Sequence, residues 1–463
     1  MITGKDLIDM GFKPGKWFGP AIDAANDAEE AGSSVDEIRK IVAGFQPAPT
    51  MPLRAAGGRE FFINIDGDHE DERTNIDSVV ETMSELMRTP VVEGGAVMPD
   101  ACPAGGLGTI PVGGVVKSKH IHPGMHSADI CCSVAITTMG KADPIRLLDA
   151  MQAVTHFGGG GRRQESQVKP SNVLLAQIEA NPFLGKEAVL VAIEHHATQG
   201  DGNHFAFVGR IRSTGETALV THHGSRKPGA MLYKAGMATA QRHCREVSPE
   251  TIRANVWIDA DSEDGEAYWE ALQIIREWTK SNHFALHDMA IDCAGMGRGS
   301  DRFWNEHNFI WRKSDGYFYH GKGATPGWDG FAHDSAGVTL VPLNMAEPVL
   351  ITRGLNADHG LGFLPHGAGR NFSRSEHTRR NADRSKEEII AEETRDVDAR
   401  FWCGIPDTSE LPSAYKNADA IVEQIERYKL AEIVDYVDPI GCIMAGDWMK
   451  PFRDKRVEQR SKN

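Results

Sequence analysis

The chain has 463 residues, of which 40% are hydrophobic and 25% are charged, which is an ordinary globular composition. No stretch approaches the roughly 20 apolar residues that span a bilayer, and no secretory signal precedes the first helix, so we expect a cytoplasmic protein that does not enter the membrane. The seven cysteines, scattered from Cys102 to Cys442, argue against a disulfide framework. A net charge of −15 disfavours non-specific binding to nucleic acid, so an RNA partner would need a local basic patch.

Residues 1–48 are predicted to be helical. Ser34-Val35-Asp36-Glu37 fits a capping box, Ile38 and Ile41 form an apolar stripe behind it, and Gly44 is placed to end the helix. The three prolines of the stretch 46–52 indicate a linker. We therefore divide the chain into an N-terminal helical segment, residues 1–48, and one large domain, residues 49–463.

From residue 53 onward, short β-segments alternate with glycine-rich loops. Ser314-Asp315-Gly316 separates two segments that predict a hairpin, Phe309–Arg312 and Tyr317–Tyr319, and helices are predicted over 264–280 and 375–397. Strands and helices do not alternate regularly and no internal repeat is present. We therefore expect an α+β fold with mixed or antiparallel sheets and surrounding helices. The remaining strand candidates are Glu60–Ile65, Ala188–Ile193, Phe205–Ile211 and Ala218–Val220.

Six short stretches place a histidine, cysteine, aspartate or lysine beside glycines or at a predicted strand end. Loops at strand ends are where rigid scaffolds present functional groups. Taken singly, each has a structural explanation, because a lone histidine is more often a surface or core residue than a ligand. Taken together, their imidazoles, thiolate and carboxylate would suit zinc, iron or manganese. The stretches are Asp129–Cys132, Gly202–Phe205, His222–Arg226, Glu306–Phe309, Gly321–Pro326 and His366–Arg370.

The stretch His366-Gly367-Ala368-Gly369-Arg370 predicts a nest of backbone N–H groups beside an arginine, which would suit a phosphate. It also begins a candidate basic patch, although such clusters are more often solvated faces. The patch comprises Arg370, Arg374, Arg379, Arg380 and Arg384, and a second candidate is Arg162–Arg163. Four histidines without comparable surroundings are interpreted as structural: His283, His287, His333 and His359.

The residues of these stretches, and the order in which the stretches follow one another, resemble those of the RtcB family of GTP-dependent RNA ligases. The likeness runs from Met98 to Arg374, with a thinner match over 438–446. It begins with Pro99-Asp100 and Pro111–Val115, and the six stretches then follow in the family's order. Asp129–Cys132 resembles D-x-G-C, Gly202–Phe205 resembles GGNHF, and His222–Arg226 resembles H-x-G-S-R.

The resemblance implies an enzyme that joins RNA 3′-phosphate or 2′,3′-cyclic phosphate ends to 5′-hydroxyl ends, in RNA repair or tRNA splicing. Two Mn²⁺ ions would be held, with the cysteine bridging, by Asp129, Cys132, His204, His222 and His307. His366 would be the nucleophile that takes up a nucleotide from GTP or another nucleoside triphosphate. The implied contacts to the nucleotide or to RNA phosphate are Asn203, Arg226, Asn308, Lys322, Pro342, Asn344, Met345, Gly367, Ala368, Gly369 and Arg370.

The chain departs from the family's pattern at the groups that recognise guanine. A glutamate after the N-H-F motif is Phe207 here, and a serine after the loop 342–346 is Val349. The lysine of the family's C-terminal stretch is missing from Pro439–Gly446, although Lys450 follows soon after. Two glycines around the ligand cysteine are also replaced, by Cys131 and Ser133. We therefore expect guanine selectivity to be weakened or changed.

Two alternatives to ligation stay open. The protein could cap RNA or DNA 3′-phosphate ends as a nucleotidyltransferase that does not seal them. It could also be a metal-bearing RNA-binding protein that has lost the use of nucleotides, although the retained metal ligands and His366 argue against this. The physiological RNA, the oligomeric state and any activating protein are not encoded in recognisable motifs.

Overall fold

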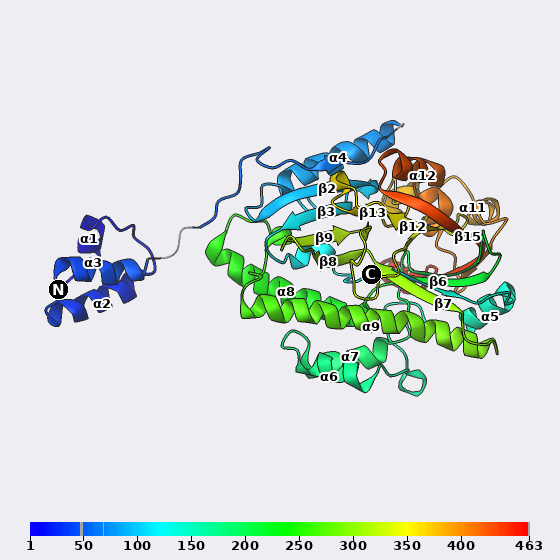
Figure 1. Ribbon diagram of the computed structural model, residues 1–463, viewed down its shortest axis with the longest axis horizontal. Coiled ribbons are helices and arrows are strands. Elements are labelled where there is room, and N and C mark those ends of the chain that lie inside the picture. Colours follow the sequence, from blue (N-terminus) through cyan, green and yellow to red (C-terminus); the bar gives the residue numbers. More distant parts are fainter. Residues whose placement is uncertain (47–49, 68, 462–463) are drawn as a thin grey trace. The chain divides into compact units, whose positions relative to one another are not determined.

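The computed structural model describes residues 1–46, 50–67 and 69–461, and it divides into two compact units (Figure 1). The first unit comprises Met1–Pro52 with Arg245–Pro249, and the second comprises Leu53–Cys244 with Glu250–Asn463. The boundary predicted between residues 48 and 49, and part of the predicted linker, lie outside the described residues.

The N-terminal unit is helical, as predicted. Its helices are α1 (Gly4–Asp9), α2 (Phe18–Glu30) and α3 (Val35–Gly44), and their apolar faces meet around Leu7 and Val42. The capping box that begins α3 is present, since Ser34 Oγ accepts from the Glu37 N–H and the Glu37 carboxylate accepts from the Ser34 N–H at 2.8 Å. This local signal fixes where the helix begins.

The larger unit is built on two sheets that are antiparallel except for the pairings β1–β2 and β14–β15, which confirms the α+β prediction. In the larger sheet the strands run in the order β11-β12-β15-β5-β6-β4-β7, and β14 adds a parallel pairing to β15. Their bounds are β4 (Ser133–Thr138), β5 (Phe205–Ile211), β6 (Thr217–His223), β7 (Asp301–Glu306), β11 (Thr339–Pro342), β12 (Val349–Gly354), β14 (Asp398–Phe401) and β15 (Ala431–Met444).

The second sheet has the order β1-β2-β3-β9-β8, and a separate two-stranded ladder joins β10 to β13. The predicted hairpin is confirmed, because β8 and β9 pair antiparallel across the Ser314–Gly316 turn. The bounds are β1 (Phe62–Ile63), β2 (Val92–Cys102), β3 (Val112–Ser118), β8 (Asn308–Arg312), β9 (Phe318–Lys322), β10 (Ala324–Pro326) and β13 (Phe363–Pro365).

Helices cover the sheets. The longest, α9 (Glu263–Cys293), packs with α5 (Pro144–Val154) against the larger sheet, and α6 and α7 lie on the outer side of α9 (Figure 1). Within the described residues no helix is both long and apolar enough to cross a membrane. The other helices are α4 (Glu70–Leu86), α6 (Asn172–Ala180), α7 (Gly185–His195), α8 (Arg226–Val247), α10 (Arg374–Arg380), α11 (Lys386–Glu393), α12 (Ala418–Arg427) and α13 (Lys450–Ser461).

Three element predictions need correction. The strand predicted at Ala188–Ile193 is wrong, because this run lies inside α7 and buries residues 188, 191, 192 and 195, a helical period. The single helix predicted over 375–397 is two helices, since Asn381 ends α10 and Ser385 caps α11. The strand predicted at Glu60–Ile65 is only the short β1, whereas Phe205–Ile211 is β5 to the residue.

The alternation of β5 divides the core between the two faces of the larger sheet. Ala206 and Val208 pack on the face covered by α5 and α9, whereas Phe207 packs on the opposite face with Val349 and Met444. One edge of this second apolar cluster is open and forms a wall of the cavity described next. The fold therefore places a large apolar surface directly beside the polar strand ends.

Candidate active site

A cavity of about 600 Å³ opens in the larger unit and gathers most of the residues that the sequence singled out. Of the predicted site residues, only His204 and Arg226 are outside its lining. The predicted residues that line it are Asp129, Cys132, Asn203, His222, His307, Asn308, Lys322, Pro342, Asn344, Met345, His366, Gly367, Ala368, Gly369 and Arg370.

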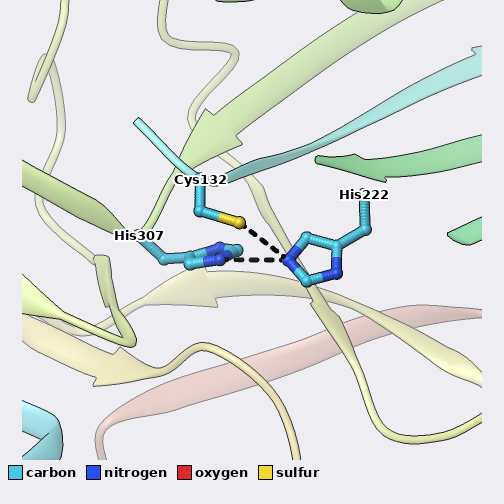
Figure 2. Close-up of side chains that lie close together, drawn as sticks. All are labelled: Cys132, His222 and His307. Carbon is cyan, nitrogen blue, oxygen red and sulfur yellow. Dashed lines mark hydrogen bonds between the residues drawn. The ribbon is translucent and has the colours of Figure 1, made fainter. Parts of the chain in front are cut away.

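Strand register brings the first group of candidate metal donors together. Ser133 of β4 pairs with His223 of β6 and with Glu306 of β7, so their neighbours Cys132, His222 and His307 end up at one edge of the sheet. Cys132 Sγ lies 3.1 Å from His222 Nε2, which lies 3.3 Å from His307 Nε2 (Figure 2). All three side chains are buried.

A second group shares the same thiol. His204 Nε2 lies 3.2 Å from Asp129 Oδ2 and 3.6 Å from Cys132 Sγ. Asp129, Cys132 and His204 can therefore present one ligand atom each to a common point, as Cys132, His222 and His307 can. His204 lies directly behind the cavity wall and reaches the site through this group.

The hydrogen bonds of the imidazoles leave their inner nitrogens free to bind a cation. His204 Nδ1 donates to the Gln199 carbonyl at 2.6 Å and His222 Nδ1 to the Asn203 carbonyl at 3.1 Å, so each Nε2 carries a lone pair. Burial lowers the pKa of His222 to about 3 and that of His307 well below its usual value. These converging lone pairs fit a metal centre, as the sequence led us to expect.

Burial raises the pKa of the Cys132 thiol well above its usual value, and the neighbouring Asp129 carboxylate adds to the effect. A thiolate at this position needs a cation to stabilise it. Cys132 belongs to both donor groups, so the two groups together could hold one or two ions.

Two histidines of α9 support the strands that carry these donors. His283 lies 3.0 Å from Ser133 Oγ and 2.7 Å from Thr221 Oγ1, and His287 Nε2 lies 2.8 Å from the same Thr221 hydroxyl. Both rings are fully buried and point to β4 and β6. Their contacts agree with the structural interpretation made from the sequence.

His366 faces the metal donors and is held by a buried carboxylate. Its ring centroid lies 4.9 Å from that of His307. Asp100 Oδ2 accepts from His366 Nδ1 at 2.5 Å and from its backbone N–H at 3.1 Å, and Asp100 is fully buried. Because a carboxylate accepts, this contact places the proton on Nδ1 and leaves the Nε2 lone pair available.

The loop that follows His366 approaches the backbone of Asp100 closely. Gly369 has a φ of +71°, and a Cβ atom there would lie 2.0 Å from the Asp100 carbonyl oxygen, so only glycine fits. Gly367, Ala368 and Gly369 therefore expose backbone to the cavity, as a phosphate-binding nest requires.

One buried carboxylate, Glu410, anchors the cations at this side of the cavity. It pairs with Arg370 Nη1 at 3.1 Å and with the Arg374 guanidinium, and it accepts from the Tyr415 hydroxyl at 2.6 Å. Two guanidiniums on one carboxylate leave a net positive charge in the cavity wall. All four side chains line the cavity.

The two remaining predicted cations differ in their surroundings. Lys322 lines the cavity, and its Nζ donates to the Ile110 carbonyl at 3.0 Å. Arg226 is not among the lining residues, and it donates to the Gly158 carbonyl at 2.6 Å and to Thr198 Oγ1 at 3.2 Å. Its predicted contact with a phosphate stays a prediction.

The opposite end of the cavity is apolar. Phe207, Val349 and Met444 of three neighbouring strands line it, together with Met345. A polar side chain at this end is Asn344, whose Oδ1 accepts from the Ala346 N–H at 2.9 Å. Its amide hydrogens can therefore donate to a ligand. Lys450 is not among the lining residues.

The basic patches predicted from the sequence are largely neutralised. Arg379 pairs with Glu376, Arg380 with Glu376 and Asp71, and Arg384 with Glu392. Arg162 is buried and donates to backbone carbonyls. Of the first patch, only Arg370 and Arg374 line the cavity.

Sequence reasoning assigned no role to Asp100, Glu410 or Tyr415. Asp100 belongs to the Pro99-Asp100 stretch that carried part of the family resemblance. The sequence therefore singled out Asp100 but did not show that it contacts His366. Glu410 and Tyr415 lie in no motif, and 40 positions separate Glu410 from Arg370. Only the fold brings them together.

Comparison with known proteins agrees with this geometry. A family model described as "tRNA-splicing ligase RtcB" matches residues 176–445. The tRNA-splicing ligase RtcB of Thermococcus kodakarensis is 24% identical over 88% of this chain and 97% of its own length. That of Pyrococcus abyssi is 25% identical over 52% of this chain, and the RNA-splicing ligase RtcB of Mycobacterium tuberculosis is 24% identical over 53%. The chain spans 30% of the Pyrococcus relative's length.

Proposed function

The chain belongs to the RtcB family, and from this premise we propose that it is an RNA ligase that joins 3′-phosphate or 2′,3′-cyclic phosphate ends to 5′-hydroxyl ends. The observation that carries the proposal is the position of His366. A buried carboxylate holds its ring at Nδ1, and the ring lies beside the imidazole and thiol donor cluster at the start of a glycine-rich loop. RNA repair or tRNA splicing is the process in which such ends arise.

His366 Nε2 attacks the α-phosphorus of a nucleoside triphosphate, forming a P–N bond as the bond to pyrophosphate breaks. Asp100 keeps the proton on Nδ1 and stabilises the positive charge that develops on the ring. The backbone of Gly367–Gly369, with Arg370 and Lys322, receives the phosphates. A 2′,3′-cyclic phosphate end is first opened by water to a 3′-phosphate. The RNA 3′-phosphate then displaces His366 from the nucleotide, and a 5′-hydroxyl attacks the activated 3′-phosphate, forming the phosphodiester bond and expelling the nucleoside monophosphate.

We propose that Asp129, Cys132, His204, His222 and His307 would hold two Mn²⁺ ions. When bound, these ions supply Lewis-acid polarisation of the phosphate under attack. Asn203 orients His222 through its carbonyl, and the side-chain amide of Asn308 donates to the Asp129 carbonyl at 3.4 Å. The seven cysteines are all free thiols, which suits reaction in a reducing compartment such as the cytoplasm.

The experiment that tests the proposal uses the purified full chain with Mn²⁺ and each α-³²P-labelled triphosphate in turn. We expect an acid-labile adduct that disappears in His366→Ala and persists in His359→Ala, a histidine outside the cavity. An adduct that survives His366→Ala, for example on Lys322, would refute the assignment.

A second step separates ligation from its alternatives. RNA with a 3′-phosphate is incubated with and without a 5′-hydroxyl partner strand. We expect a joined product with the partner present. Activated 3′ ends that are never joined would instead identify an end-capping nucleotidyltransferase, and RNA binding without any adduct would identify a binding protein.

A further inference from the structure

A second cavity, of about 540 Å³, lies in the larger unit outside the site described above. It shares no lining residue with the first cavity. Its walls combine cations, aromatic rings and two carboxylates. The cations are Lys117, Arg312 and Lys313, the rings are Tyr319, Trp328 and Phe331, and the carboxylates are Asp329 and Asp358.

Two of these cations lack an anionic partner. Lys117 pairs with Asp315 at 2.8 Å. In the part of the chain that the structure describes, Arg312 and Lys313 form no ion pair, and Lys313 Nζ donates only to the Leu361 carbonyl at 2.7 Å. Burial lowers the pKa of Lys313 to about 8, and the neighbouring Asp315 and Asp358 carboxylates offset this effect only in part. An anionic ligand would supply the missing charge.

Aromatic surfaces adjoin this unpaired charge. Lys313 Nζ lies 3.9 Å from the centroid of the Trp328 ring, so it covers one face of the indole. The Phe331 ring lies 6.1 Å from Trp328 at an interplanar angle of 71°, and the two half-buried rings form a corner. A flat ring that stacks on one of them meets the edge of the other.

A glycine keeps this arrangement open. Gly362 has a φ of +79°, and a Cβ atom there would lie 2.6 Å from Lys313 Nζ and 3.3 Å from Trp328 Cε3. Any side chain would displace the lysine from the indole. The close approach of backbone, ammonium and ring therefore depends on this residue.

The strands that line the first cavity lead directly to the second. Asn308 of β8 lines the first cavity and Arg312, at the other end of the strand, lines the second. The same holds for Lys322 and Tyr319 of β9, and for His366 and Gly362 at the two ends of β13. Four residues of strand span about 13 Å. The two cavities therefore lie about this far apart along the strands, a separation comparable with the length of a few nucleotides.

We propose that the second cavity binds one nucleoside phosphate unit, with the single-stranded RNA substrate as its source. Lys313 and Arg312 bind the phosphate, and the corner of Trp328 and Phe331 stacks the base. The carboxylates of Asp329 and Asp358 limit the site to one anionic group and accept hydrogen bonds from ribose hydroxyls or base amino groups. This proposal rests on the proposed function only for its source of nucleotides.

The test measures equilibrium binding of fluorescent oligoribonucleotides with a 3′-phosphate, two to twelve nucleotides long, to the full chain. The variants are Arg312→Gln, Lys313→Gln and Trp328→Leu, and Lys169→Gln is the matched control, since it is an exposed lysine outside both cavities. We expect about tenfold weaker binding of the longer strands by the first three variants, with a shallower salt dependence for the two charge variants. Dinucleotide binding should be unchanged.

Labelling of His366 from a triphosphate is measured in parallel. It should be the same in all variants, which separates this site from the catalytic one and shows that each variant is folded. Free nucleoside monophosphates are tested as ligands of the same proteins. Variant-dependent binding of the monophosphate alone would retain the nucleotide site but overturn the RNA strand as its source. Equal affinities of wild type, Lys313→Gln and Lys169→Gln for every ligand would overturn the site itself.

Discussion

Replacing Asp100 by asparagine tests the central contact of the proposed mechanism. The carboxylate accepts two hydrogen bonds from His366, and asparagine keeps its size but loses its charge. A hydrogen bond to a charged group contributes about 1.5–3 kcal/mol, and each 1.4 kcal/mol corresponds to about a tenfold change in rate. An asparagine amide that donates to Nδ1 would also move the ring proton to Nε2 and block attack. We therefore expect nucleotide transfer to His366 to slow by roughly 100-fold or more.

The assay is the single-turnover rate of labelling from an α-³²P triphosphate with Mn²⁺, with bound metal measured on the same samples. Metal content should not change, since Asp100 belongs to neither donor group. The matched control is Asp259→Asn, which alters a carboxylate 3.4 Å from His120, a histidine outside the cavity, and should label at the wild-type rate. Wild-type labelling by Asp100→Asn would refute the role of this contact.

Three further outcomes are expected. Cys132→Ala should lower the metal content of the purified protein, and equal content in variant and wild type would contradict the shared-thiol site. In competition with the other triphosphates, labelled GTP should be preferred by less than about tenfold. A hundredfold preference would contradict this, because it would mean that the apolar end of the cavity recognises guanine. Glu410→Gln should raise the KM for nucleotide or RNA about tenfold with a smaller change in kcat, because Arg370 and Arg374 lose their anchor, and Glu392→Gln should change neither.

Elements with a local signal could be predicted from the sequence. The Ser34 capping box, the alternation of Phe205–Ile211 and the turn at Ser314–Gly316 each involve residues within a few positions of one another. The run Ala188–Ile193 was wrongly predicted as a strand, because six consecutive apolar residues fit a buried strand as well as a buried helix face. The break between α10 and α11 depends on Ser385 capping a new helix inside a charged, apparently continuous stretch.

The candidate site divides in the same way. Residues such as Cys132 and His222 could be named because they belong to motifs that resemble those of the family. Strand register then brings them to one end of the larger sheet. The partner of His366 could not be named, since Asp100 is 266 positions away. The motif around Arg226 suggested a phosphate contact, and nothing in the sequence indicated the hydrogen bond that its guanidinium donates to the Gly158 carbonyl.

The two ends of the catalytic cavity obey different physical constraints. At the polar end each donor must occupy one position relative to the others, so we expect the loss of Cys132 or His366 to abolish the proposed chemistry. At the apolar end Phe207, Val349 and Met444 belong to the hydrophobic core, and they keep water out of it. A base there is held by contact area and by Asn344, and the apolar side chains offer no acceptor for the ring and amino N–H groups of guanine. Adenine should therefore bind at least as well as guanine, and both purines better than the smaller pyrimidines.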